Sequence, residues 1–122
     1  MKKKVLFILT SVIFLLLMTV TTKAQDMCAT NPSHCKLLND TAGMKMMIIT
    51  LKPGDKLVSH THPLNFVYVL KGGLYKWTYT NGKTESMNLK AGDHFVGPPE
   101  DAHKSWNAGK TTIQILFFEK NS

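Results

Sequence analysis

The sequence predicts an all-β domain that folds as a barrel or jelly roll. Beyond residue 43, short runs rich in Val, Ile, Thr and aromatic residues follow one another at close, even spacing. Clusters of Gly, Asn, Asp and Pro separate these runs, and such clusters are typical of turns. No run has the 3.6-residue hydrophobic period of an amphipathic helix. Many short strands divided by turns are characteristic of sandwiches and barrels.

The first predicted strand covers residues 44–51, which are apolar nearly throughout. It ends at Lys52-Pro53-Gly54-Asp55, a strong turn signal. A continuous apolar run of this length is typical of a strand that is buried on both faces. We therefore expect this strand at the centre of the fold.

The remaining predicted strands are all short. Asn81-Gly82 separates two of them and predicts a hairpin with a type I′ turn, in which both central residues have positive φ. The predicted strands are residues 56–60, 66–70, 74–80, 84–89, 94–96, 102–106 and 111–119.

The first 24 residues have the layout of a secretory signal peptide. Three lysines precede an apolar run from Val5 to Val20, and a small or polar stretch follows it. Thr22 and Ala24 occupy the two small-residue positions before a cut, so we expect cleavage after Ala24 and a periplasmic or secreted product. The alternative is an uncleaved membrane anchor. Residues 1–24 are thus assigned to the signal, 25–43 to a leader and 44–120 to the barrel domain.

The charge pattern argues against nucleic-acid binding. The chain has a formal net charge of +7, but four of its 15 basic residues lie in the predicted signal. The remaining 11 basic residues and the 8 acidic residues give a net charge of +3 outside the signal. The chain has no arginine, and its lysines outside the signal are scattered, whereas nucleic-acid sites carry clustered Lys and Arg. Membrane contact is expected only through the signal before cleavage.

The predicted leader is polar and turn-rich, so we expect regular structure to begin only at residue 44. It contains Cys28 and Cys35, the two cysteines of the chain. In an oxidising compartment they form either a disulfide or two free thiols, and the compartment favours the bond.

Three histidines form the candidate metal site. His60 and His62 alternate on a predicted strand, so their side chains share one face and offer two imidazoles to one ion. A barrel could bring His103 opposite them. Three neutral imidazoles suit Zn, Fe, Cu or Ni and leave coordination positions open for water or a substrate.

These histidines lie in two patterns that resemble the motifs of the cupin superfamily. The first, Gly-x5-His-x-His, begins at Gly54, and the second, Gly-x5-Pro-x-Gly-x2-His-x3-Asn, begins at Gly92 and ends at Asn107. Glu100 stands where the second motif has Gly. The resemblance covers roughly residues 44–119 and implies the double-stranded β-helix of a small stand-alone cupin. It also implies a divalent transition metal, Fe, Zn, Ni or Mn, held by His60, His62 and His103.

One ligand of the family pattern is missing. The cupin motif places a Glu after the second histidine, and counting back from the following glycines puts it at Asn65 or Phe66. Neither residue is an acid, so we expect weaker metal binding than in cupins that keep the Glu. Three-histidine sites do occur in the superfamily, notably in the cysteine dioxygenase kind. His94 is either a fourth ligand or a surface residue.

The resemblance does not select a chemistry, because cupins include enzymes, sugar-binding modules and storage proteins. The first hypothesis is a metal-dependent enzyme with a small-molecule substrate, for which Tyr68, Tyr75 and Glu100 are candidate acids or bases. The second is a non-catalytic, metal-free module that binds a small molecule. In the third hypothesis, the histidines have only a structural role in the core. The aromatic candidates for a pocket are Tyr68, Tyr75, Trp77, Tyr79 and Trp106. A separate expectation is that the protein forms a homodimer through residues 44–51.

Overall fold

The structure is a computed structural model that describes residues 26–121. The predicted signal peptide and the cleavage after Ala24 lie outside the described residues. Within residues 26–121, no helix is both long and apolar enough to cross a membrane.

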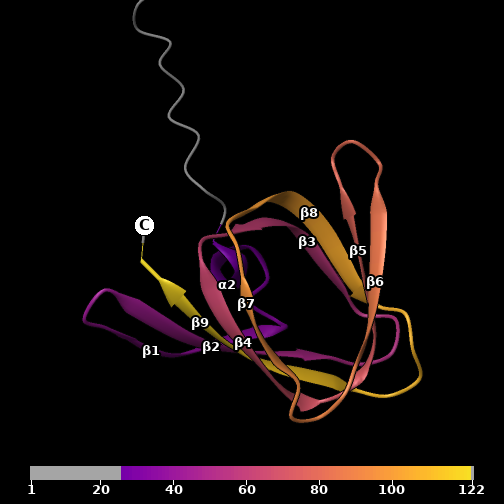
Figure 1. Cartoon of the computed structure of the whole chain (residues 1–122), viewed down its shortest axis with the longest axis horizontal. Coiled ribbons are helices and arrows are strands. Elements are labelled where there is room, and N and C mark those ends of the chain that lie inside the picture. Colours follow the sequence, from indigo (N-terminus) through magenta and orange to yellow (C-terminus); the bar gives the residue numbers. More distant parts are fainter. Residues whose placement is uncertain (1–25, 122) are drawn as a thin grey trace, which may run out of the picture.

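Two antiparallel sheets face each other and form the predicted jelly-roll barrel (Figure 1). The first sheet has the order β1 (Cys35–Thr41), β2 (Met44–Leu51), β9 (Ile113–Lys120), β4 (Asn65–Lys71) and β7 (His94–Gly97). The second has the order β3 (Lys56–His62), β8 (Glu100–Asn107), β5 (Gly73–Tyr79) and β6 (Thr84–Leu89). Strands far apart in sequence are neighbours in both sheets, as a double-stranded β-helix requires. The all-β prediction is confirmed.

The hydrophobic core lies between the sheets and is built by alternating residues. Met47, Ile49 and Leu51 of β2 are buried, and the residues between them are partly exposed. The expectation that this strand is buried on both faces is therefore wrong, because one face of an antiparallel sheet is turned outward. The other buried apolar side chains of the barrel include Leu57, Val67, Val69, Leu89, Ile113, Ile115 and Phe117.

The expectation that regular structure begins at residue 44 is also wrong. A short helix, α2 (Met27–Thr30), is followed by β1, which pairs with β2. Ala42 and Gly43 join these strands with φ angles of 55° and 75°, the conformation of a two-residue primed turn. Alanine rarely adopts this conformation, and all of β1 after Cys35 is exposed, so neither turn chemistry nor hydrophobic pattern marked the hairpin.

The leader is fastened to the barrel by covalent and polar contacts. Cys28 and Cys35 form the predicted disulfide, with a Cα–Cα distance of 4.9 Å. Buried Asn31 accepts a hydrogen bond at its Oδ1 from the backbone N–H of Val58 on β3, at 2.7 Å. The leader therefore helps to fix the strand that carries His60 and His62.

The predicted hairpin at Asn81-Gly82 is confirmed, but its turn type differs. β5 and β6 pair antiparallel from Thr78 opposite Thr84. Gly82 has a φ of 85°, whereas Asn81 does not have positive φ. The turn is also longer than two residues, because the N–H of Tyr79 bonds the carbonyl of Lys83 at 2.9 Å.

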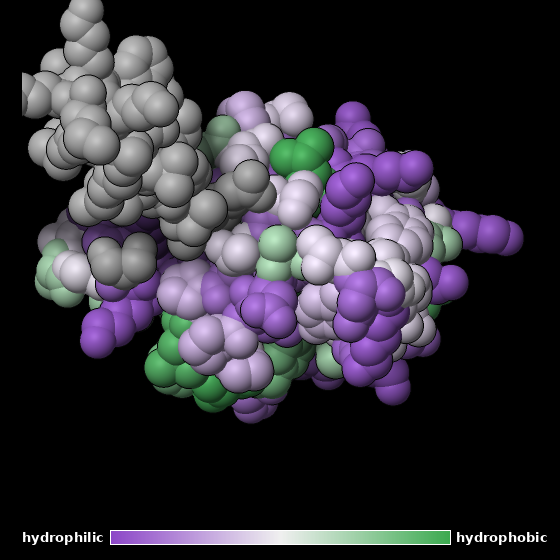
Figure 2. All heavy atoms as spheres, turned by 90° about the horizontal axis from the view of Figure 1, so that it is seen from above, coloured by the Kyte–Doolittle hydropathy of each residue, from purple (hydrophilic) through white to green (hydrophobic). Residues whose placement is uncertain are grey.

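Exposed apolar side chains are concentrated on β4 and β7. Phe66, Tyr68 and Leu70 alternate along β4, and Val96 lies opposite Phe66 on β7. Figure 2 shows that hydrophobic residues gather at the lower border of the face it presents, while hydrophilic residues cover much of the rest. By contrast β2, the expected dimer strand, has both of its edges paired, with β1 and β9.

Candidate metal centre

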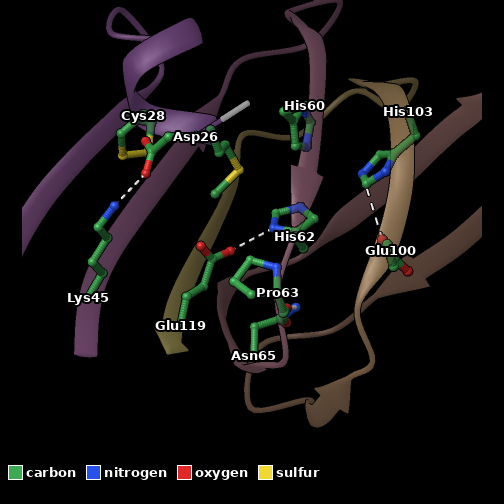
Figure 3. Close-up of polar contacts among 12 residues, drawn as sticks. Asp26, Cys28, Lys45, His60, His62, Pro63, Asn65, Glu100, His103 and Glu119 are labelled. Carbon is green, nitrogen blue, oxygen red and sulfur yellow. Dashed lines mark hydrogen bonds and ion pairs between the residues drawn. A yellow bond between two sulfur atoms is a disulfide. The ribbon is translucent and has the colours of Figure 1, made fainter. Parts of the chain in front are cut away.

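Pairing between β3 and β8 brings the three predicted histidines together. His60 and His103 are direct cross-strand partners, and His62 lies on the same side of β3 as His60. One ring nitrogen from each of the three lies within 4.8 Å of the others, and all three residues are buried. Figure 3 shows the three side chains converging from the two strands. The sequence prediction that these residues meet is confirmed.

The second ring nitrogen of each histidine is held by an oxygen that can only accept. His60 Nδ1 donates to the carbonyl of Val58 at 2.8 Å, and His103 Nδ1 donates to that of Asp101 at 2.9 Å. His62 Nδ1 donates to the carboxylate of Glu119 at 2.6 Å. These partners place the proton of each neutral ring on Nδ1 and leave the lone pair on Nε2, as in metal-binding histidines.

Among residues 26–121, the Nε2 atom of His60 has no hydrogen-bond partner although it is fully buried. An unsatisfied polar atom in a protein interior costs about 1–3 kcal/mol. A metal ion held by the three Nε2 atoms would remove this cost. The donor set therefore fits a divalent transition metal.

Burial favours the neutral form that a metal requires for two of the imidazoles, those of His60 and His103. Removal of His60 from water is the main reason that its pKa falls to about 4, and the neighbouring imidazoles of His62 and His103 lower it further. Burial likewise lowers the pKa of His103, although the nearby charge of Glu100 opposes the shift. Protons therefore compete less with a metal at these two rings than at exposed histidines.

Glu119 is a residue of the candidate site that sequence reasoning missed. It lies on β9 with its side chain almost fully buried, and its Oε1 accepts the hydrogen bond from His62. A carboxylate behind a ligating histidine orients the ring and raises its basicity. The signal was present, because Glu119 continues the inward-facing alternation of Ile113, Ile115 and Phe117, where an acid is out of place unless it has a partner.

The structure decides which residue occupies the place of the missing family carboxylate. Asn65 is 3% exposed and lines the cavity beside His62 and His103, whereas Phe66 is 54% exposed on the outer face. The Nδ2 of Asn65 donates to the carbonyl of Pro63 at 2.9 Å. Asn65 therefore occupies the position of the missing carboxylate ligand, and Phe66 does not.

We expect Asn65→Glu to tighten metal binding, because it adds a negative charge at the wall of the site. Phe66→Glu is the matched control and should leave affinity unchanged, because residue 66 points away from the cavity. Zinc titration against a chromophoric chelator measures both. Equal affinities for the two variants would contradict this placement of the vacant ligand.

A cavity of about 220 Å³ adjoins the histidines. Its polar lining includes His62, His103, Asn65 and Glu100, and within residues 26–121 no lysine lines it. The rest of the wall is largely apolar and aromatic, formed by Val67, Tyr75, Trp77, Met87, Leu89, Phe95, Val96, Ile115 and Phe117. The volume is below the ~300–1,000 Å³ of sites for drug-sized molecules, which indicates a small ligand.

The other candidate residues separate into those inside the site and those outside it. Tyr75 and Glu100 line the cavity, and burial raises the pKa of Tyr75 to about 12, which keeps its hydroxyl protonated. Tyr68 is exposed on β4 and is not in the cavity wall. His94 is exposed and bonds the carbonyl of Gly92 at 3.1 Å, so the surface alternative for His94 is the correct one.

Among the predicted pocket aromatics, Trp77 lines the cavity together with Tyr75. Tyr79 is not in the cavity wall, although its ring centroid lies 5.8 Å from that of His103. Trp106 borders a separate surface groove beside Lys56 and Lys104. Phe95 and Phe117 line the cavity instead, and their inward orientation follows from strand register, which composition alone does not give.

Comparisons with known proteins agree with this fold. A cupin domain from Bordetella pertussis Tohama I superposes with a TM-score of 0.64 at 18% identity, over 72% of this chain and 92% of that one. An RmlC-like cupin family protein with a double-stranded β-helix fold from Methanocaldococcus jannaschii superposes with a TM-score of 0.58 at 15% identity, over 71% and 78%. No curated protein matches the sequence.

The family comparison is more direct. The family model described as a cupin domain matches residues 47–119, which is more than half of the chain and includes all three histidines. The chain therefore belongs to the cupin domain family.

Proposed function

We propose that the protein binds one divalent transition metal through Nε2 of His60, His62 and His103, and a small, largely apolar molecule in the adjoining cavity. The observation that carries the proposal is the buried, unpartnered Nε2 of His60. His60 lies beside two further imidazoles whose Nδ1 atoms are likewise bound to oxygen acceptors. Neutral imidazoles in this arrangement suit Zn, Fe or Ni.

The cavity wall supports the second part of the proposal. Its polar groups are the two histidines, Asn65 and Glu100, and the remaining wall is largely apolar. A ligand with an apolar body and one polar end would bury the body against residues such as Trp77 and Phe95. Its polar end would face the metal. Because no lysine of the described part of the chain lines the cavity, a metal ion would be the main positive charge available to an anionic group there.

We also propose that the protein is exported. The disulfide between Cys28 and Cys35 supports this, because such bonds persist in the periplasm or outside the cell and are rare in the cytosol.

The test is metal binding by the purified protein. Elemental analysis after purification without added metal is expected to find a transition metal, and calorimetry of the stripped protein is expected to show one site. A metal at 100 times its Kd should raise stability by about 2.7 kcal/mol. If Zn²⁺, Ni²⁺, Mn²⁺ and anaerobic Fe²⁺ give neither heat nor a shift in Tm, the metal proposal is wrong. The protein is then a metal-free binding module.

A further inference from the structure

We propose that Glu100 is the fourth protein ligand, so that this cupin takes its carboxylate from the second motif instead of the first. The inference rests on the proposed metal function and goes beyond it. Three observations carry it: the position of Glu100, the nature of the atoms it faces, and the charge that the three histidines leave uncompensated.

Glu100 is placed at the site by strand pairing. It is the first residue of β8 and lies opposite His62 of β3, three residues before His103. Its carboxylate lines the cavity, and its Oε2 lies 3.7 Å from Nε2 of His103 (Figure 3). Two ligand atoms on one ion, with bonds of about 2.0–2.2 Å, lie about 3–3.5 Å apart. A small adjustment of this flexible side chain would therefore bring both atoms onto one metal.

The two facing atoms are both acceptors. The Nδ1–H of His103 is given to the carbonyl of Asp101, so Nε2 presents a lone pair to Glu100. Within the described residues, Nε2 of His103 is also the one basic nitrogen within 4.0 Å of the carboxylate of Glu100. Two lone pairs facing each other at this distance are unfavourable unless a positive group lies between them. The unpartnered Nε2 of buried His60 lies in the same cluster and needs the same group.

The carboxylate of Glu100 also supplies negative charge that the three neutral imidazoles do not provide. Three neutral imidazoles leave a divalent ion with its full +2 charge in a cavity that has an apolar wall, which is costly. Asn65, at the place of the family's usual carboxylate, supplies no charge, and its amide is bonded to Pro63. Glu100 supplies the missing negative charge from across the barrel, in a position where the family motif has glycine. An oxygen ligand also makes the site more favourable for Mn²⁺ and Fe²⁺ than three nitrogens alone.

The test compares metal affinity and coordination in Glu100→Gln, Glu100→Gly and the wild type. We expect Zn²⁺ affinity to fall by at least about tenfold in both variants, the lower limit for loss of a supporting group at a metal site. The visible spectrum of the Co²⁺-substituted protein should change in both. Glu85→Gln is the matched control, because Glu85 is paired with Lys83 on the β5–β6 hairpin and does not line the cavity, and it should match the wild type.

The outcomes separate this inference from the proposed function. If the wild type binds Zn²⁺ and Glu100→Gln binds it equally tightly with an unchanged Co²⁺ spectrum, Glu100 is no ligand and the three-histidine site stands. If the wild type binds none of the metals, the proposed function itself is wrong. Glu100→Gly guards against misfolding, because it restores the residue that the motif usually has there.

Discussion

Replacement of His62 by alanine is expected to abolish measurable metal binding and to destabilise the metal-free protein. His62 supplies one of three neutral nitrogen donors, and its Nδ1 bond to Glu119 fixes the direction of the ring. The two remaining imidazoles, even with Glu100 as a ligand, leave one further coordination position to water. We expect the affinity for Zn²⁺ to fall by more than about 100-fold, the upper limit for loss of a residue that only supports a ligand.

The loss of stability has a separate cause. The His62–Glu119 pair is about 95% buried on both sides, and alanine would leave the carboxylate of Glu119 without its partner. Leaving a buried group without its hydrogen-bond partner costs about 1–3 kcal/mol, and more when the group is charged. The His62 ring also stacks on Phe117 at a centroid distance of 5.3 Å, and that contact is lost as well. Water that enters the vacated space would reduce the cost.

Two further variants isolate these effects. His62→Ala with Glu119→Gln also removes the buried negative charge and should recover part of the lost stability without recovering metal binding. His94→Ala is the control, because His94 lies on the surface outside the cluster. Urea unfolding measures stability, and chelator competition measures affinity. If His62→Ala keeps wild-type affinity, His62 is not a ligand.

The sequence predicted the barrel well because its strands are separated by strong turn signals. The predicted ranges 44–51 and 84–89 match β2 and β6, and the other predicted strands each overlap one observed strand. Turn residues determine the local backbone conformation, so they predict turns without knowledge of the fold. β1 was missed because this local signal is absent from its turn. The turn contains Ala42, a residue type that gives no indication of positive φ.

The site was predicted only in part, because the rest depends on register. His60, His62 and His103 follow from motif spacing, and strand alternation alone places the first two on one face. Asn65 and Phe66 are adjacent in the sequence. Adjacent side chains on a strand point to opposite faces of the sheet, so the choice between them requires the strand register. Glu119 reaches His62 through a hydrogen bond that spans 57 residues of sequence. No local pattern encodes such a contact.

The stability of the metal-free protein is expected to fall as the pH decreases from about 6.5 to about 4. The folded protein holds His60 fully buried, and its pKa is lowered from 6.5 to about 4, chiefly by burial. In the unfolded chain the same imidazole takes up a proton near its ordinary pKa. The unfolded state therefore binds more protons between these two pH values, and protons favour unfolding there.

The sign and size of the effect follow directly. Above pH 6.5 His60 is neutral in both states, and its contribution to stability is fully present. Each pH unit between the two pKa values removes about 1.36 kcal/mol, so the loss down to about pH 4 is about 3 kcal/mol. Burial of His103 lowers its pKa as well and adds a loss in the same direction.

Urea unfolding in the presence of a chelator, at pH 7, 6, 5 and 4.5, measures this loss. His60→Gln should flatten the profile because glutamine does not titrate, whereas His94→Ala should keep the wild-type slope. With saturating Zn²⁺ the wild type should be more stable at pH 7, because the ion binds the folded state. Its profile should then approach that of the metal-free protein as protons displace the ion. Parallel profiles for the wild type and His60→Gln would show that His60 is not held neutral by burial. The low-pH loss would then have to come from other groups.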